Sequence, residues 1–123
     1  MRISYTRRNQ RYNQRLTECF KQHGLDFIVV SAPESALNGI YNVAFKGLRS
    51  DALVYLLEER GIYVSAGSAC HAGSNEPSRV LQNAGVNPDY IDGAIRLSFG
   101  KADVPIEYIA EQVVECVMQL VEV

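Results

Sequence analysis

At 123 residues, the chain is long enough to bury the core of one domain and too short for a second. Hydrophobic residues make up 47% of the sequence and charged residues 21%, a composition that excludes a disordered or fibrous protein. The net charge of −2 argues against a nucleic-acid partner, and the lack of a long apolar run or secretion signal predicts a cytoplasmic protein with no membrane association.

The first third of the chain is predicted to contain one helix and two strands. Residues 6–23 are mostly polar, with apolar residues three and four positions apart, which predicts a surface helix ended by Gly24. Residues 27–30 form a short β-branched run, and residues 41–45 alternate between apolar and polar-compatible positions. Both segments predict strands, with turn-forming residues between them.

A second helix, a third strand and a loop follow. Ser50 is expected to cap the helix, Asp51 to lie favourably at its positive end, and Gly61 to stop it. Residues 62–64 predict a strand. Residues 65–75 are mainly alanine, glycine and serine, which offer almost nothing to bury, so we expect a loop there.

The last third predicts a mixture of short elements and one long helix. Pro77 to Leu81 suits a short helix, and Asn87 with Pro88 suits a turn. Residues 95–99 alternate as a strand, and residues 106–120 repeat apolar side chains at the spacing of a buried helical stripe. Together the elements predict an α+β fold, in which a small mixed or antiparallel sheet is covered by helices.

The arginines are distributed unevenly, because five of the nine precede the first acidic residue, Glu18. A solvated helix face is the first explanation, a docking surface for a partner the second, and an organelle transit peptide the third. These five are Arg2, Arg7, Arg8, Arg11 and Arg15.

Three cysteines without metal-ligand spacing predict reduced thiols, with neither a disulfide framework nor a metal site. Cys19 and Cys116 lie on the apolar stripes of predicted helices, so we expect both in the core. Cys70 instead follows small residues and has His71 and Arg79 nearby in sequence, cations that could favour its thiolate. From these residues alone, Cys70 is either a reactive thiol or simply a small residue in a turn.

Several segments of the sequence resemble the cysteine desulfurases of the class V aminotransferase family. SAGSACHAGSNEPSRVL is similar to the SxGSACxSxxxxPSxVL loop of those enzymes. YNVAFKGLRSDALVYLLEERGIYVSAGSAC resembles the strand, helix and strand that lead into the loop, and IDGAIRLSFG resembles the strand that follows it. The resemblance extends over about residues 26–121, and its compatible spacing makes a chance match improbable.

This resemblance implies roles for two residues. In the family, the loop cysteine accepts sulfur from L-cysteine held on pyridoxal phosphate, which leaves alanine and a persulfide; the matching residue is Cys70. The arginine of the following strand binds the substrate carboxylate, and the matching residue is Arg96. A thiolate on a mobile loop can collect and deliver sulfur, and a guanidinium on a strand is a rigid, planar partner for a carboxylate.

The sequence also departs from the family. His71 stands where a small residue is expected; it either tunes Cys70 or is an ordinary exposed loop histidine. The large domain that holds pyridoxal phosphate through a lysine is absent from the sequence, and Lys21, Lys46 and Lys101 lie in no context that resembles that site. We therefore expect this chain alone to bind no pyridoxal phosphate and to be inactive.

The expected organisation is an interdomain helix over residues 1–25 and a small C-terminal domain over residues 26–123. Its expected partners are L-cysteine, a large cofactor-binding domain and a sulfur-acceptor protein, within a complete enzyme that is a dimer. The acceptor pathway stays open, whether iron–sulfur cluster assembly, thiolated tRNA or a cofactor. Two alternatives to this enzymatic role are a non-catalytic sulfur-carrier or docking domain and an inert remnant.

Overall fold

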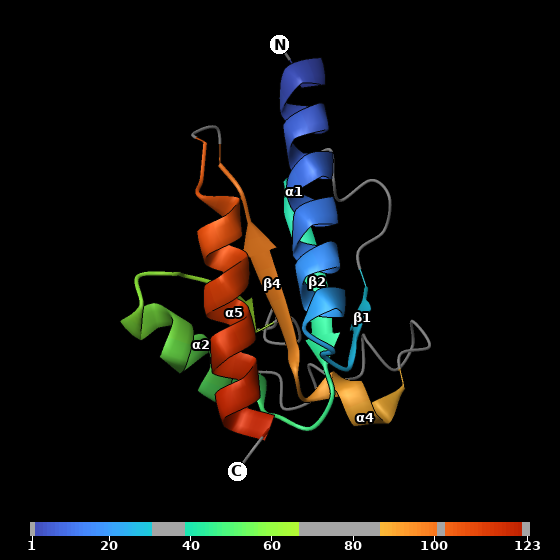
Figure 1. Ribbon diagram of the computed structural model, residues 1–123, viewed down its shortest axis with the longest axis vertical. Coiled ribbons are helices and arrows are strands. Elements are labelled where there is room, and N and C mark those ends of the chain that lie inside the picture. The colour runs from blue at the N-terminus through green and yellow to red at the C-terminus, as the bar shows by residue number, and fades with distance from the viewer. Residues whose placement is uncertain (1, 31–38, 67–86, 101–102, 122–123) are drawn as a thin grey trace, which may run out of the picture.

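The computed structural model describes residues 2–30, 39–66, 87–100 and 103–121, with side chains from residue 7 onward. These segments contain both helices and strands (Figure 1). The helices are α1 (Arg2–Gln22), α2 (Ser50–Glu59), α4 (Pro88–Ile91) and α5 (Ile106–Val121); the strands are β1 (Phe27–Val29), β2 (Ile40–Phe45), β3 (Ser65–Ala66) and β4 (Ala94–Ser98).

The four described strands form one antiparallel sheet in the order β1-β2-β4-β3. In the register, Val43 lies opposite Ile95 and Tyr41 opposite Leu97. Helices α1 and α5 pack against each other and lie in front of the sheet, with α2 beside α5 (Figure 1). The predicted α+β class, a small sheet covered by helices, is therefore confirmed, and the pairing is antiparallel.

Helix α1 is held in place by an apolar stripe. Tyr12, Leu16 and Phe20 recur every four residues and are all buried, so one side of the helix faces the sheet. The Phe20 ring packs edge-on against Phe27 and Phe45, with centroids 5.5 and 5.4 Å away. The predicted helix is confirmed, although it begins four residues earlier than expected.

Helix α5 confirms the other periodic prediction. Ile106, Val113 and Val117 are buried, and Cys116 is fully buried beside them, as expected of a core cysteine. None of the described helices combines the length and apolar character that a membrane span requires.

The start of α2 differs from the prediction. Arg49, not Ser50, occupies the cap position, and no side chain caps the helix. Ser50 is already helical, and its amide donates to the Asp92 carbonyl at 2.6 Å. Asp51 does lie in the first turn, where its carboxylate accepts from the guanidinium of Arg49 at 2.8 Å. Gly61, at φ +80°, follows the end of the helix as predicted.

The third strand lies later than predicted. Residues 62–64 are not in a strand, and β3 consists of Ser65 and Ala66, which were assigned to the loop. The amide of Ile62 bonds to the Leu57 carbonyl in the turn that closes α2, and the Ile62 side chain is buried. Pairing between β3 and β4 therefore begins only at Ser65, which lies opposite Arg96.

The turn expected at Asn87 and Pro88 is the start of a short helix, α4. The Asn87 side chain accepts from the amide of Asp89 at 2.9 Å and so caps the helix. Tyr90 donates to Asp26 at 2.5 Å, which ties α4 to the segment before β1. The short helix expected over residues 77–81 lies outside the described residues.

Gly93, just before β4, allows a close backbone approach to β2. Its carbonyl accepts from the amide of Phe45 at 3.0 Å. A Cβ atom at this position would overlap the carbonyl oxygen of Phe45 and lie 3.3 Å from the side chain of Leu48. Only glycine fits here without moving a backbone.

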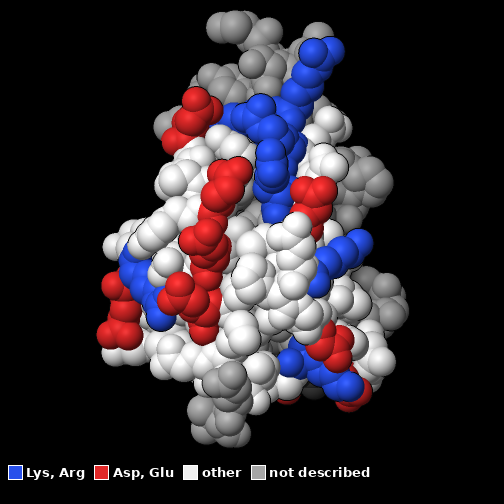
Figure 2. All heavy atoms as spheres, viewed as in Figure 1, with Lys and Arg blue, Asp and Glu red and all other residues white. Residues whose placement is uncertain are grey.

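The arginines of α1 are only partly a solvated face. Arg7, Arg11 and Arg15 are exposed, and Figure 2 shows basic side chains gathered over this part of α1. Arg8, however, is buried: it donates to Asn9 at 3.1 Å and to the carbonyl of Gly100. The prediction of a solvated face is wrong for Arg8, because residues between β4 and α5, Gly100 and Asp103, lie against it.

Candidate functional site

Arg96 lies on the sheet face opposite α1 and α5. Its neighbours Ile95 and Leu97 belong to the core, so alternation along β4 turns Arg96 to the other face, where it is half-buried. Asn42 on β2 and Ser65 on β3 lie directly opposite Arg96 on its two sides. These three residues, here called the polar row, therefore cross the sheet on one face.

The polar row suits an external carboxylate. A guanidinium presents paired N–H donors, while the amide and hydroxyl beside it add hydrogen-bonding groups without negative charge. None of the ion pairs formed by the described residues includes Arg96. Arg96 therefore forms no surface salt bridge with another described residue.

The polar row does not fit pyridoxal phosphate by itself. Proteins hold this cofactor through a lysine and an acidic partner for the pyridine nitrogen. The described strand residues on this face include neither a lysine nor a carboxylate. Lys21 is exposed on the last turn of α1, and the Lys46 ammonium lies 4.0 Å from the Asp26 carboxylate. Lys101 lies outside the described residues.

Cys70, the predicted reactive thiol, lies outside the described residues, as do His71 and all other motif residues after Ala66. In sequence it follows the last residue of β3, Ala66, by four positions. Strand β3 also contains Ser65, a member of the polar row, so the Cys70 segment continues directly from the strand beside Arg96.

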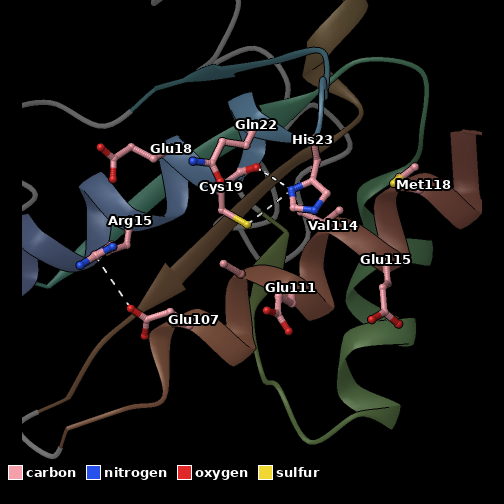
Figure 3. A pocket seen from close by; sticks show the side chains of 11 residues that line it. Arg15, Glu18, Cys19, Gln22, His23, Glu107, Glu111, Val114, Glu115 and Met118 are labelled. Carbon is pink, nitrogen blue, oxygen red and sulfur yellow. Dashed lines mark hydrogen bonds and ion pairs between the residues drawn. The ribbon is translucent and has the colours of Figure 1, made fainter.

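The two other cysteines have poor environments for a thiolate. Burial raises the pKa of Cys116, as does Glu115, while the nearby Arg60 acts in the opposite direction. Burial also raises the pKa of Cys19, and Glu111 adds to this effect. Cys19 is only half-buried, so its expected core position is wrong in part: it lines a hollow between α1 and α5, and its Sγ lies 3.8 Å from Nδ1 of His23 (Figure 3).

The hollow between α1 and α5 was not predicted as a site. Its volume is about 470 Å³, and its lining combines Cys19 and His23 with several glutamates (Figure 3). Within the described residues, however, no three histidine, cysteine or acidic side chains are placed to hold a metal ion. Sequence reasoning also missed Asn42 and Ser65, because only the strand register brings them beside Arg96.

Comparison with known proteins gives one consistent result. The family model described as Aminotransferase class-V matches residues 3–104. The chain is 38% identical over 90 residues to "Cysteine desulfurase IscS" of Methanosarcina thermophila, an alignment that covers 73% of this chain and 22% of that protein. It is 44% identical over 68 residues to "IscS-like cysteine desulfurase" of Mycobacterium tuberculosis, covering 55% of this chain and 17% of the relative.

Solved structures with a similar fold include two NifS-like proteins. One, titled "NIFS-LIKE PROTEIN", matches with a TM-score of 0.74 and 23% identity over 96% of this chain and 29% of its own. The NifS-like protein from Rickettsia africae matches with a TM-score of 0.65 and 17% identity over 98% of this chain and 30% of its own. At these identities the likeness concerns the fold alone. The chain spans about a fifth of the length of the curated relatives it matches.

Proposed function

Because the chain belongs to the class V aminotransferase family, we propose that it is the sulfur-accepting, C-terminal part of a pyridoxal-phosphate-dependent cysteine desulfurase. In this proposal Cys70 takes sulfur from L-cysteine and Arg96 binds the substrate carboxylate. A separate large domain holds the cofactor, which supplies the electron-withdrawing chemistry when bound. The relatives named as cysteine desulfurases, and the polar row, support this assignment.

The observation that carries the proposal is the position of Arg96 in the polar row. A half-buried guanidinium is costly to leave without a partner of opposite charge, and the described residues give it none. An amino-acid carboxylate would provide that charge in a planar, two-point contact. The rigid β4 strand, paired on both sides, would fix the direction of this contact.

Cys70 is proposed as the sulfur acceptor because it lies only four positions after β3, the strand that contributes Ser65 to the polar row. Four residues of chain span at most about 14 Å, so Cys70 cannot move further than that from Ala66. In the proposed reaction, the Cys70 thiolate forms a bond to the substrate sulfur as the carbon–sulfur bond breaks. The carbon then takes up a proton, so L-cysteine and a thiol give alanine and a persulfide, which is passed to a sulfur-acceptor protein.

The division of the chain forms part of the same proposal. Residues 1–25 would connect to the large domain, and residues 26–123 would form the small domain of a complete dimeric enzyme in the cytoplasm. Helix α1 packs closely on α5, which supports the proposal that α1 and the small domain form one unit.

Replacing Arg96 by alanine is expected to weaken the binding of L-cysteine when the chain is combined with a complementary large domain. The lost contact is charge-assisted and contributes about 1.5–3 kcal/mol, which corresponds to a rise in KM of about ten- to 150-fold. Steady-state kinetics of alanine release measure this effect. Arg49→Ala, which removes an exposed arginine paired with Asp51, is the matched control and should leave KM unchanged. An unaltered KM for Arg96→Ala would show that Arg96 is structural.

The chain on its own is expected to bind no pyridoxal phosphate and to release no alanine from L-cysteine. The reason is that the polar row offers neither the lysine nor the acidic partner that this cofactor requires. Absorbance spectra with stoichiometric cofactor, followed by borohydride reduction and peptide mapping, test this expectation. A reduced cofactor attached to Lys21, Lys46 or Lys101 would contradict it.

A further inference from the structure

Three side chains with soft metal-binding atoms border the hollow between α1 and α5. Cys19 lies on α1, His23 immediately follows α1, and Met118 lies on α5. Together they contribute a thiol, an imidazole and a thioether (Figure 3). His23 and Met118 also line a second hollow, of about 440 Å³, so both side chains lie at the boundary between the two hollows. The proposed sulfur transfer uses none of these three side chains.

The turn at the end of α1 places the thiol against the imidazole ring. Cys19 and His23 are four positions apart, and the backbone amide of His23 donates to the Cys19 carbonyl at 3.1 Å, so both residues lie on one side of the helix. The Cys19 sulfur lies 3.8 Å from Nδ1 of His23. Rotations of these two side chains therefore suffice for both to contact one ion.

The hydrogen bond made by His23 decides which ring nitrogen is available. Nδ1 lies 2.9 Å from the backbone carbonyl oxygen of Cys19. Because a carbonyl oxygen can only accept a hydrogen bond, Nδ1 carries the ring proton, and Nε2 of the neutral ring has a free lone pair. Metal-binding histidines commonly have this arrangement, in which the second nitrogen donates to a carbonyl and fixes the direction of the ring.

The hollow also favours positive charge. Glu18 and Glu111 line it, and neither forms an ion pair with another described residue. Arg15, which lines it as well, lies 3.9 Å from Glu107, so its charge is partly offset. Glu111 lies close enough to the Cys19 thiol to raise its pKa, and the same carboxylate would attract a cation bound at the sulfur.

We propose that Cys19, His23 and Met118 bind a soft monovalent metal ion, Cu(I), in this hollow. Thiolate and thioether sulfur select Cu(I) over harder ions, and imidazole is compatible with it. Met118 is 39% exposed and has a flexible, unbranched side chain, so its thioether can turn toward the ion. On binding, the Cys19 thiol releases its proton to solvent and forms a sulfur–copper bond, while copper stays in the +1 state.

Cu(I) fits these residues better than Zn²⁺ does. Structural zinc sites use a closed tetrahedral set of thiolate, imidazole or carboxylate ligands, and no three described side chains of these kinds are placed to form one. The expectation of no metal site rested on the spacing between cysteines. The proposed ligands are instead of three different kinds, and only the packing of α1 on α5 brings Met118 to the same hollow as Cys19 and His23.

Titration of the whole chain with Cu(I), in competition with a chromophoric Cu(I) chelator, tests the proposal. The titration is anaerobic, with ascorbate as reductant, and uses a Cys70→Ser background so that this thiol does not contribute. A single equivalent of Cu(I) per chain should be withheld from the chelator. X-ray absorption at the copper edge should then show both sulfur and nitrogen neighbours.

Replacement of each ligand should weaken binding in this background. Cys19→Ser and His23→Ala should each weaken it about tenfold or more, and Met118→Leu, which nearly keeps the side-chain volume, severalfold. His71→Ala, which removes the other histidine of the chain, is the matched control for His23→Ala. Gln22→Ala changes a side chain that lines the same hollow without a soft donor, and both controls should bind Cu(I) like the background chain.

Several results would contradict this site. Circular dichroism first establishes that each variant is folded, and the copper-edge spectrum tests the ligands without replacing any of them. Loss of all Cu(I) to the chelator in the background chain, a spectrum without both kinds of neighbour, or unchanged affinity in any ligand variant would overturn the proposal. Because the titration contains neither L-cysteine nor pyridoxal phosphate, this failure is distinct from failure of the proposed sulfur transfer.

Discussion

Replacing Cys70 by serine is expected to abolish sulfur transfer from L-cysteine when the chain is combined with a complementary large domain. A serine hydroxyl is not ionised near neutral pH and cannot form a persulfide. The variant therefore has no atom at position 70 that can accept sulfur. Persulfide on the chain, detected by mass spectrometry, is the measurement. Cys19→Ser is the matched control because it removes a thiol at the molecular surface of the α1–α5 hollow and should preserve transfer. Full transfer by Cys70→Ser would refute the assignment.

The reactivity of the three thiols in the isolated chain can also be compared by limited alkylation at neutral pH. Thiolates are the reacting species, and burial raises the pKa of both Cys19 and Cys116, so their thiolate fraction at neutral pH is reduced. Cys70 should be labelled first, and labelling of Cys19 should increase as pH rises toward its raised pKa. Preferential labelling of Cys116 at neutral pH would contradict the proposed role of Cys70.

Gly93→Ala is expected to destabilise the fold by about 3 kcal/mol, at the upper end of ordinary overpacking effects. The added methyl group would overlap the carbonyl oxygen of Phe45, which is backbone and cannot rotate away. Relief requires separation of β4 from β2 near the hydrogen bond between Gly93 and Phe45. Urea unfolding of the whole chain, followed by circular dichroism, measures the change in the free energy of unfolding.

Gly100→Ala is the control for that experiment. A Cβ atom on Gly100 would meet no atom within 4 Å, and the residue does not have a positive φ angle. Its replacement should change the free energy of unfolding by less than about 1 kcal/mol. Equal midpoints for the two variants would show that the close approach at Gly93 is not a constraint on the fold.

Local patterns predicted the long elements correctly. The spacing of Leu16 and Phe20 in α1, and of Val113 and Val117 in α5, requires only that one side of a helix be buried. Short elements were less predictable, because few residues contribute to them. Ile62 looked like a strand residue but is used in the turn after α2, whereas Ser65 looked like loop and pairs with β4.

The sequence by itself determined the fold class, the family resemblance, and Cys70 and Arg96 as the residues to test, because these depend on short-range periodicity and motif spacing. The tertiary structure decided which residues surround Arg96, because the strand register brings Asn42 and Ser65 from distant parts of the chain to its two sides. It also decided that Arg8 is buried and Arg11 exposed, although both belong to one arginine-rich segment. Packing removes one side of α1 from water and leaves the other side exposed, where charged residues are tolerated. The two sides differ only because α1 packs against the sheet and α5.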